Sequence, residues 1–383
     1  MEIKDIIFSL IKSEIGYGEA DPAAAFCDKE ILYRTCERHD IAQIIGDALI
    51  KLDAFSEEED KIKKKFRANI FLAIYRETQL ETVGGIAMKT LINNGIKFVP
   101  LKGAIIRKLY PQPWMRTSCD IDILVGDNDF DRALACLKKD GFIVERDRNY
   151  HDVSLYYGDA HVELHFNICE NMPQMDVVLS EIWDNVEQYN GCEYRESKEF
   201  FVFHHIAHMA YHIKAGGCGI RPFVDLWLLR NKNYYDEEKL KAFLDRSELT
   251  TFYERVIELI DVWFNGGKRS EKTANFEDYV ISGGIYGNLK NKITMGVAAS
   301  KKSKLKYVFK SAFPGYKMMK ILYPALEKHK VLLPFCYIHR IIKKLFGKNG
   351  VKVRGRFNSA KNYSETDINF AASLLDDLGI KNQ

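Results

Sequence analysis

Apolar residues recur at helical spacing through the first ninety-four residues. Three stretches carry the pattern, "DIIFSLIKSEI", "ILYRTCERHDIAQIIGDALIKL" and the long "EEDKIKKKFRANIFLAIYRETQLETVGGIAMKTLINNG". This spacing places the apolar side chains on one face and predicts amphipathic helices. The last stretch ends at Asn93-Asn94-Gly95, a typical helix stop. We therefore expect an N-terminal helical region over residues 1–94.

After residue 95 the pattern changes to short strands. "IKFVPL" (96–101) and "DIDILVG" (120–126) predict strands, and each is followed by a helical stretch, "GAIIRKLY" and "DFDRALACLKKDG". "FIVERD" (142–147), "DVSLYYG" and "HVELHFNI" predict three further strands, the last two joined by a tight turn at Gly158-Asp159. These elements predict a small mixed α/β unit of about residues 95–170, within a core that we bound at 95–197.

From Lys198 onward the pattern is helical again, beginning with "KEFFVFHHIAHMAYHIKAGG" and "RPFVDLWLLRN". There is no repeat and no low-complexity linker, so these helices are expected to pack onto the α/β unit. The sequence thus predicts an α+β fold: a small mixed sheet with flanking helices, embedded between helical regions at 1–94 and 198–383.

Composition narrows the class of protein. With 383 residues, 46% hydrophobic and 28% charged, the chain is an ordinary globular protein of two or three structural units. No stretch is apolar for long enough to span a bilayer, and the N-terminus lacks the pattern of a signal peptide, so we expect a cytoplasmic location. The eight cysteines form no C-x-x-C pair, which argues against a zinc site or a disulfide framework.

The formal charge of +3 is unevenly distributed. Residues 301–356 contain many Lys and Arg residues and a single acid, Glu327. The stretch "KHKVLLPFCYIHRIIKKLFGKNGVKVRGR" mixes basic and aromatic residues, which suits an RNA acceptor. It equally suits an amphipathic helix on anionic lipid, or an ordinary basic surface, which is the commonest explanation.

Two carboxylates stand out on the second predicted strand. Asp120 and Asp122 share one face, while Ile121, Ile123 and Val125 turn toward the core. Carboxylates held this close repel one another unless a cation lies between them, and Mg²⁺ suits such an oxygen site.

A later strand offers a third acid. In "HVELHF", Glu163 and His165 share the polar face, and Glu163 would complete a two-metal centre of the kind used in phosphoryl or nucleotidyl transfer. His165 is expected to orient the acid, contact substrate or be structural, and the sequence does not separate these roles.

Upstream, Gly103 follows a strand and begins a helix. A helix N-terminus offers free N–H groups, and glycine lets a phosphate approach the backbone. Lys102 and Arg116 would then neutralise a triphosphate. Asp-x-Asp and Lys-Gly are each common alone, and their combination in this order is far more specific.

The combined order resembles the DNA polymerase β-like nucleotidyltransferase superfamily. More narrowly, "VPLKGAIIRKLYP", "RTSCDIDILV", "VELHF" and "HHIAHMAYH…RPFVDLWLL" resemble the uncharacterised bacterial nucleotidyltransferase family with a Leu-Lys-Gly signature, over roughly residues 30–345. The resemblance implies metal-binding acids at Asp120, Asp122 and Glu163 and a nucleotide-cradling turn at Lys102 and Gly103. The usual turn is Gly-Gly or Gly-Ser, whereas Ala104 stands here, so the serine hydroxyl is missing.

The resemblance implies a metal-dependent enzyme. It would transfer an NMP group from an NTP to an acceptor hydroxyl and release pyrophosphate, using two Mg²⁺ ions, with Mn²⁺ as the alternative. The acceptor stays open among a small molecule, a protein and RNA. One alternative is a catalytically silent binding protein or antitoxin-type regulator, although such a protein has no physical reason to keep three repelling acids. Another is a toxin-like tRNA nucleotidyltransferase, since the Lys-Gly step also resembles abortive-infection nucleotidyltransferases.

Two further features lie in the C-terminal helical region. His204, His208 and His212 recur at helical spacing on one face, which would suit a zinc pair. We favour a helix packed beside the catalytic unit, with histidines that bond to neighbours or face a substrate cleft. Asp225 lies among apolar residues and needs a partner, for which Arg221 or a histidine is expected, in a structural role.

Overall fold

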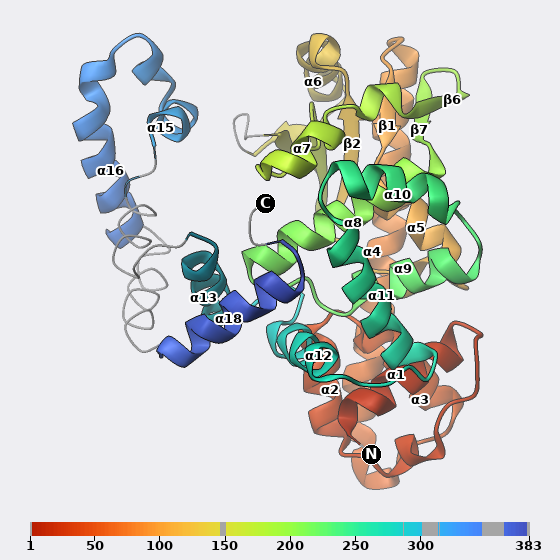
Figure 1. Cartoon of the computed structure of the whole chain (residues 1–383). Coiled ribbons are helices and arrows are strands. Elements are labelled where there is room, and N and C mark those ends of the chain that lie inside the picture. Colours follow the sequence, from red (N-terminus) through yellow and green to blue (C-terminus); the bar gives the residue numbers. More distant parts are fainter. Residues whose placement is uncertain are drawn as a thin grey trace.

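The computed structural model of the chain describes residues 2–145, 151–285, 287–300, 313, 315–346 and 364–380 (Figure 1). The last two residues of the predicted strand "FIVERD" lie outside the described residues. So do two parts of the basic C-terminal stretch, residues 301–312 and 347–356.

Four helices form the N-terminal region, as the apolar spacing predicts. α2 begins where the Asp28 carboxylate accepts hydrogen bonds from the backbone N–H groups of Glu30 and Ile31. The longest helix ends at Asn93, and Gly95 follows with φ of +62°, the left-handed conformation that glycine adopts readily. The helices are α1 (Ile3–Glu14), α2 (Lys29–Arg38), α3 (Ala42–Lys51) and α4 (Asp60–Asn93).

A mixed sheet of seven strands, in the order β3-β4-β5-β2-β1-β7-β6, follows this region. Its centre is β2, which pairs antiparallel with β1 and parallel with β5. The predicted α+β fold and all five predicted strands are confirmed. The strands are β1 (Phe98–Pro100), β2 (Asp120–Val125), β3 (Ile143–Val144), β4 (Asp152–Tyr157), β5 (Ala160–His165), β6 (Val186–Asn190) and β7 (Glu193–Glu196).

The hairpin of β6 and β7 was not predicted. It turns at Asn190-Gly191, where Gly191 has φ of +55°, and β7 extends the sheet by pairing parallel to β1. Most side chains of β6 are exposed, so the hairpin lacks the alternation of buried and exposed residues that marks a strand in sequence. The Asn-Gly pair was the one signal for it.

The two faces of the sheet meet different layers. The second half of α4 and α6 (Phe130–Lys139) cover one face, where Ile121, Ile123 and Val125 are buried as predicted. The first half of α4 belongs to a different core, in which Phe66 packs edge-on against Tyr33. This single 34-residue helix therefore connects the N-terminal helices to the sheet (Figure 1).

The other face of the sheet shares a larger core with the N-terminal and C-terminal helices. Leu124 of β2 belongs to this core, and Phe8 of α1 stacks on Trp263 at 4.3 Å between ring centroids. The C-terminal helices thus pack against the rest of the chain, as expected from the absence of a linker. They are α8 (Lys198–Ala215), α9 (Arg221–Asn231), α10 (Glu237–Arg246), α11 (Thr250–Phe264), α12 (Glu271–Gly283), α13 (Leu289–Ser300) and α18 (Glu365–Asp377).

Four more α-helices lie within the described residues. α5 (Lys102–Ile106) follows β1, and α7 (Pro173–Leu179) follows β5. α15 (Tyr316–Leu322) and α16 (Leu333–Phe346) form an arm that stands away from the body in Figure 1. Among the described helices, none has both the length and the apolar character needed to cross a membrane.

Buried His39 makes the stability of this fold depend on pH. The His39 ring, at the end of α2, donates from Nε2 to the Ile281 carbonyl of α12 at 3.0 Å, and burial lowers its pKa from 6.5 to about 4. The unfolded chain binds this proton at higher pH than the folded chain does. This contribution is therefore complete above pH 6.5 and is lost as the pH falls toward 4.

We predict that the free energy of unfolding, measured by urea titration, decreases between pH 6.5 and 4, with His39 contributing up to about 1.4 kcal/mol per pH unit. His39→Gln keeps an N–H donor for the Ile281 carbonyl but does not titrate, so its curve should be flatter. Identical slopes for the two proteins would contradict this origin.

Candidate active site

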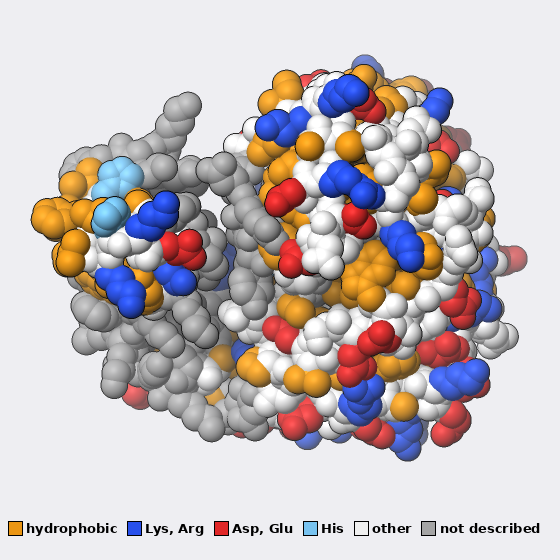
Figure 2. Space-filling view, turned by 90° about the horizontal axis from the view of Figure 1, so that it is seen from above, with side chains coloured by type: hydrophobic (Ala, Val, Ile, Leu, Met, Phe, Trp, Pro, Cys, Tyr) orange, Lys and Arg blue, Asp and Glu red, His pale blue; other side chains and the backbone are white. Residues whose placement is uncertain are grey.

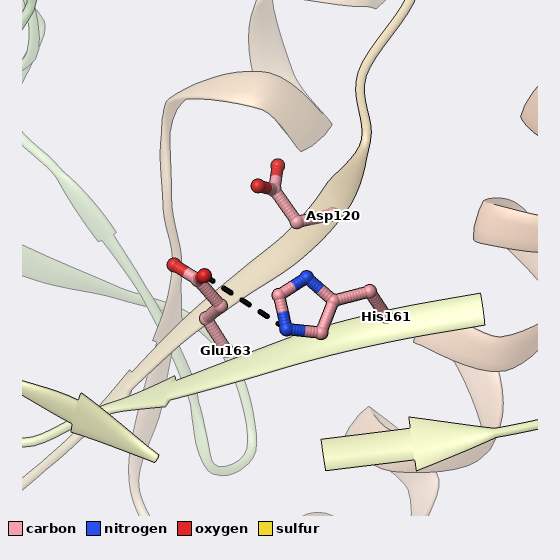
Figure 3. A group of neighbouring side chains, drawn as sticks. All are labelled: Asp120, His161 and Glu163. Atoms are coloured by element: carbon pink, nitrogen blue, oxygen red, sulfur yellow. Dashed lines mark ion pairs between the residues drawn. The ribbon is translucent and has the colours of Figure 1, made fainter. Parts of the chain in front are cut away.

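The parallel pairing of β2 with β5 gathers acids on one face of the sheet. Asp122 lies opposite Glu163 in the register, and Asp120 lies opposite His161. Ligand atoms of Asp120, His161 and Glu163 all lie within 4.8 Å of one another, and Figure 3 shows these side chains pointing to one side of the two strands. The alternation of side chains therefore brings together the three acids singled out in the sequence.

His165 completes a second, overlapping group with Asp122 and Glu163. Its Nε2 donates to Asp122 Oδ1 at 3.3 Å and lies 3.6 Å from Glu163 Oε2. Burial opposes the charge of this imidazole, but the two carboxylates outweigh it and raise the pKa of His165 to about 10. Burial likewise opposes the charge of Asp122, yet the hydrogen bond and charge of His165 hold the Asp122 pKa at about 2.

The pKa of Asp120 shifts in the opposite direction to that of Asp122, because no comparable positive charge lies beside Asp120. Burial, followed by the charges of Asp122 and Glu163, raises the pKa of Asp120 to about 7. Its carboxylate does accept a hydrogen bond from Ser118 Oγ at 3.2 Å. A cation would relieve the repulsion among the three carboxylates, and a set of carboxylate oxygens is what Mg²⁺ prefers. The residues present thus fit a divalent metal.

These groups line a cavity of about 380 Å³ between the sheet and α8. This volume falls in the range of about 300–1,000 Å³ that is usual for ligand sites. Lys102 and Gly103, at the start of α5, line the same cavity. Burial lowers the pKa of Lys102, against the opposing charges of Glu170 and Asp122. The sequence-predicted residues Lys102, Gly103, Arg116, Asp120, Asp122, Glu163 and His165 all lie along this cavity.

Arg116 is bound to a buried acid. Its Nη2 donates to Asp225 Oδ2 at 2.9 Å and its Nε to both oxygens at 3.2 Å, while Tyr110 Oη donates to Oδ1 at 2.8 Å. The expected partner of Asp225, Arg221 or a histidine, was therefore wrong. The error arose because the partner lies 109 residues away, beyond the reach of helical spacing.

Arg221 has a different set of contacts. Its Nη1 donates to the Thr117 carbonyl at 2.7 Å and to Asp40 Oδ2 at 3.2 Å, and Thr117 Oγ1 donates to the same Asp40 oxygen at 2.5 Å. Asp40 follows α2, and Arg221 begins α9. The loop that precedes β2 is thus held from both helical regions.

The histidines of α8 form the cavity wall that faces the acids. His204 Nδ1 donates to Glu196 Oε1 at 2.7 Å, and His208 Nδ1 donates to Glu170 Oε1 at 2.6 Å. His212 Nε2 then lies 2.9 Å from His208 Nε2. Burial lowers the pKa of all three rings, so they are neutral near pH 7. The favoured interpretation, histidines that bond to neighbours and face a cleft, is confirmed.

The sequence reasoning did not single out His161, which belongs to the acidic group, or Ser118 and Glu170, which line the cavity. His161 lies two positions before Glu163, so strand alternation alone could have placed it on the polar face. Ser118 provides a hydroxyl near Gly103: its Oγ lies 3.4 Å from where a Cβ on that glycine would be. Glu170 lies in the loop after β5, where no periodic signal exists.

We predict that Asp225→Ala, which leaves the Arg116 charge buried without its partner, lowers the free energy of unfolding by about 3–5 kcal/mol. Tyr110→Phe removes one hydrogen bond and should cost about 1 kcal/mol. Asp261→Ala is the matched control, because Asp261 pairs with Arg230 at 3.1 Å where both side chains are 36% exposed, and it should cost less than about 1 kcal/mol. Equal losses for Asp225→Ala and Asp261→Ala in chemical denaturation would contradict the role of the buried pair.

Comparisons with known proteins identify the family. Neither a search of curated proteins nor a search of solved structures returned a match. The model of a family described as uncharacterised nucleotidyltransferase matches residues 27–265, which is more than half of the chain and includes the whole sheet, α8 and α9. The chain therefore belongs to this uncharacterised nucleotidyltransferase family.

Proposed function

We propose that the protein is a Mg²⁺-dependent nucleotidyltransferase that transfers an NMP group from an NTP to an acceptor hydroxyl. The observation that carries the proposal is the gathering of Asp120, Asp122 and Glu163 on one sheet face beside a ligand-sized cavity. Three carboxylates this close destabilise the folded chain unless they bind a cation, so a metal-binding role explains why they lie together.

The three acids would hold the metal. Bound Mg²⁺ would supply positive charge beside the phosphate oxygens, where negative charge develops during transfer. Mn²⁺ is the alternative ion. Burial opposes a positive charge on Lys102, and an arriving triphosphate would favour the charged form of this amine.

In the reaction, the acceptor oxygen forms a bond to the α-phosphorus of the NTP. The bond from that phosphorus to the bridging oxygen of the β-phosphate breaks, and pyrophosphate leaves. Glu163 takes the hydroxyl proton. Lys102 and the backbone at Gly103 bind phosphate oxygens, and Arg116 Nη1 reaches the same place, 3.4 Å from the position of a Gly103 Cβ. The Ser118 hydroxyl, close to Gly103, stands in for the serine missing at position 104.

The identity of the acceptor separates the alternative functions. A toxin-like enzyme would label tRNA, another transferase would label a small molecule or a protein, and a silent relative would label none of them. The crowded acids favour an active enzyme over the silent relative.

We predict that the protein, incubated with each α-labelled NTP, Mg²⁺ and a cell extract, transfers label to a macromolecule or small molecule. Asp120→Asn and Asp122→Asn should each reduce labelling by about 100-fold or more, because transition-state charge is no longer stabilised. Asp131→Asn on α6 changes an exposed acid outside the cavity and should keep wild-type labelling. Labelling that persists in both site variants would refute this site, and no labelling with any NTP would favour the silent relative.

Metal binding is testable without an acceptor. Mg²⁺ binds only the folded acidic group, so adding it should raise the melting temperature, and more so when an NTP is present. In EDTA, Asp120→Asn alone should melt higher than the wild type, because Asp120 is the acid whose pKa is raised to about 7 by burial and by the charges of Asp122 and Glu163. The double variant Asp120→Asn, Asp122→Asn should show no Mg²⁺ shift. A wild-type protein with no shift in Mg²⁺ or Mn²⁺ would contradict the metal site.

A further inference from the structure

α16 carries a stripe of apolar side chains that no other described element covers. Phe335, Ile338 and Ile342 recur at i, i+3 and i+7, so they lie along one side of the helix, and Val331 lies just before it, in the 3₁₀ turn Lys330–Leu332. Their exposed fractions are 69%, 55%, 52% and 79%. Soluble proteins rarely expose so many large apolar groups in one row, so the stripe indicates a contact surface.

Other side chains of the helix make contacts within the arm. Tyr337 packs against Phe313 at 5.4 Å between ring centroids, and His339 accepts or donates a hydrogen bond with Tyr323 Oη at 2.9 Å. α15 also packs on α16. The arm therefore holds α16 in place while its apolar stripe stays exposed, and the arm itself stands away from the body (Figure 1).

The arm is strongly basic as well. Residues 315–346 contain seven Lys and Arg residues and one acid, Glu327, which lies 3.7 Å from Lys320. Lys328 and Lys330 are exposed immediately before the stripe. Figure 2 shows apolar and basic side chains close together on the described surface of this arm.

The basic charge and the apolar stripe together indicate which kind of partner this arm binds. A second copy of the chain would bring the same basic surface against this one, and the two would repel. RNA would satisfy the basic groups, but the aliphatic side chains of Val331, Ile338 and Ile342 have no counterpart in a phosphate backbone. An anionic membrane surface offers both parts: headgroup charge for the Lys and Arg residues and acyl chains for the stripe.

We propose that α16 binds in the interface of an anionic lipid bilayer, with Phe335, Ile338 and Ile342 inserted below the headgroups. α16 lies parallel to the membrane plane, as its length and polar residues do not suit a crossing. Among the described residues, no residue of α16 lines the cavity beside Asp120, Asp122 and Glu163, so the inference does not depend on the proposed function.

We expect the full chain to co-sediment with vesicles of phosphatidylcholine and phosphatidylglycerol in equal parts, and not with phosphatidylcholine alone. Raising the salt from about 0.1 M to about 1 M should weaken binding, because the Debye length falls from about 10 Å to about 3 Å. Phe335→Ser with Ile338→Ser should weaken it about tenfold or more, since two inserted apolar side chains are removed.

The matched control is Phe71→Ser with Tyr75→Ser, which removes two aromatic side chains of α4 that are 71% and 56% exposed. It should bind vesicles as the wild type does. All four positions are exposed, so circular dichroism should show folded variants in both cases. Unchanged binding by the α16 variant, or equal binding to both vesicle types, would overturn the proposal. A dimer or an RNA complex that the α16 variant abolishes, without vesicle binding, would assign the stripe to that partner instead and overturn it.

Discussion

The repulsion among three half-buried carboxylates is the constraint on which the rest of this structure depends. Asp120, Asp122 and Glu163 lie together because β2 and β5 run parallel in a fixed register, and a slip of one residue would turn every acid to the opposite face. The sheet therefore has to be firmly packed. Two layers supply this packing, the pair α4 and α6 on one face and the larger helical core on the other.

Protonated His165 reduces part of this repulsion, because its positive charge lies beside two of the three carboxylates. It neutralises Asp122 and lies close to Glu163, so the imidazolium takes part of the place of a cation within the group. Asp120 is left as the acid with the most to gain from an added positive charge. The fit of this acidic group to a divalent cation and the energy by which the group destabilises the folded chain thus have one origin, the repulsion among its carboxylates.

The alternation of side chains along a strand was sufficient to predict the acidic group, because residues two positions apart on one strand share a face of the sheet. Asp120 with Asp122, and Glu163 with His165, were found in this way, and the fold class followed from the change of period near residue 95. The pairing of Arg116 with Asp225 joins a loop to a helix far along the chain, and no local period encodes it. The β6–β7 hairpin was not predicted for a different reason, because its exposed side chains leave no apolar pattern in the sequence.

The loop before β2 shows how this cavity is assembled. Thr117 binds Asp40 and Arg221, and Arg116 binds Asp225, so a few consecutive residues are fixed by chain segments 77 and 109 residues away. Closing such long loops has an entropic cost that only the completed tertiary structure offsets. We therefore expect the cavity to be completed late in folding. The strands that carry the acids would pair first, whereas the residues that line the cavity take their places when the surrounding helices have packed. A fragment limited to the sheet would therefore carry the acids without the shaped site.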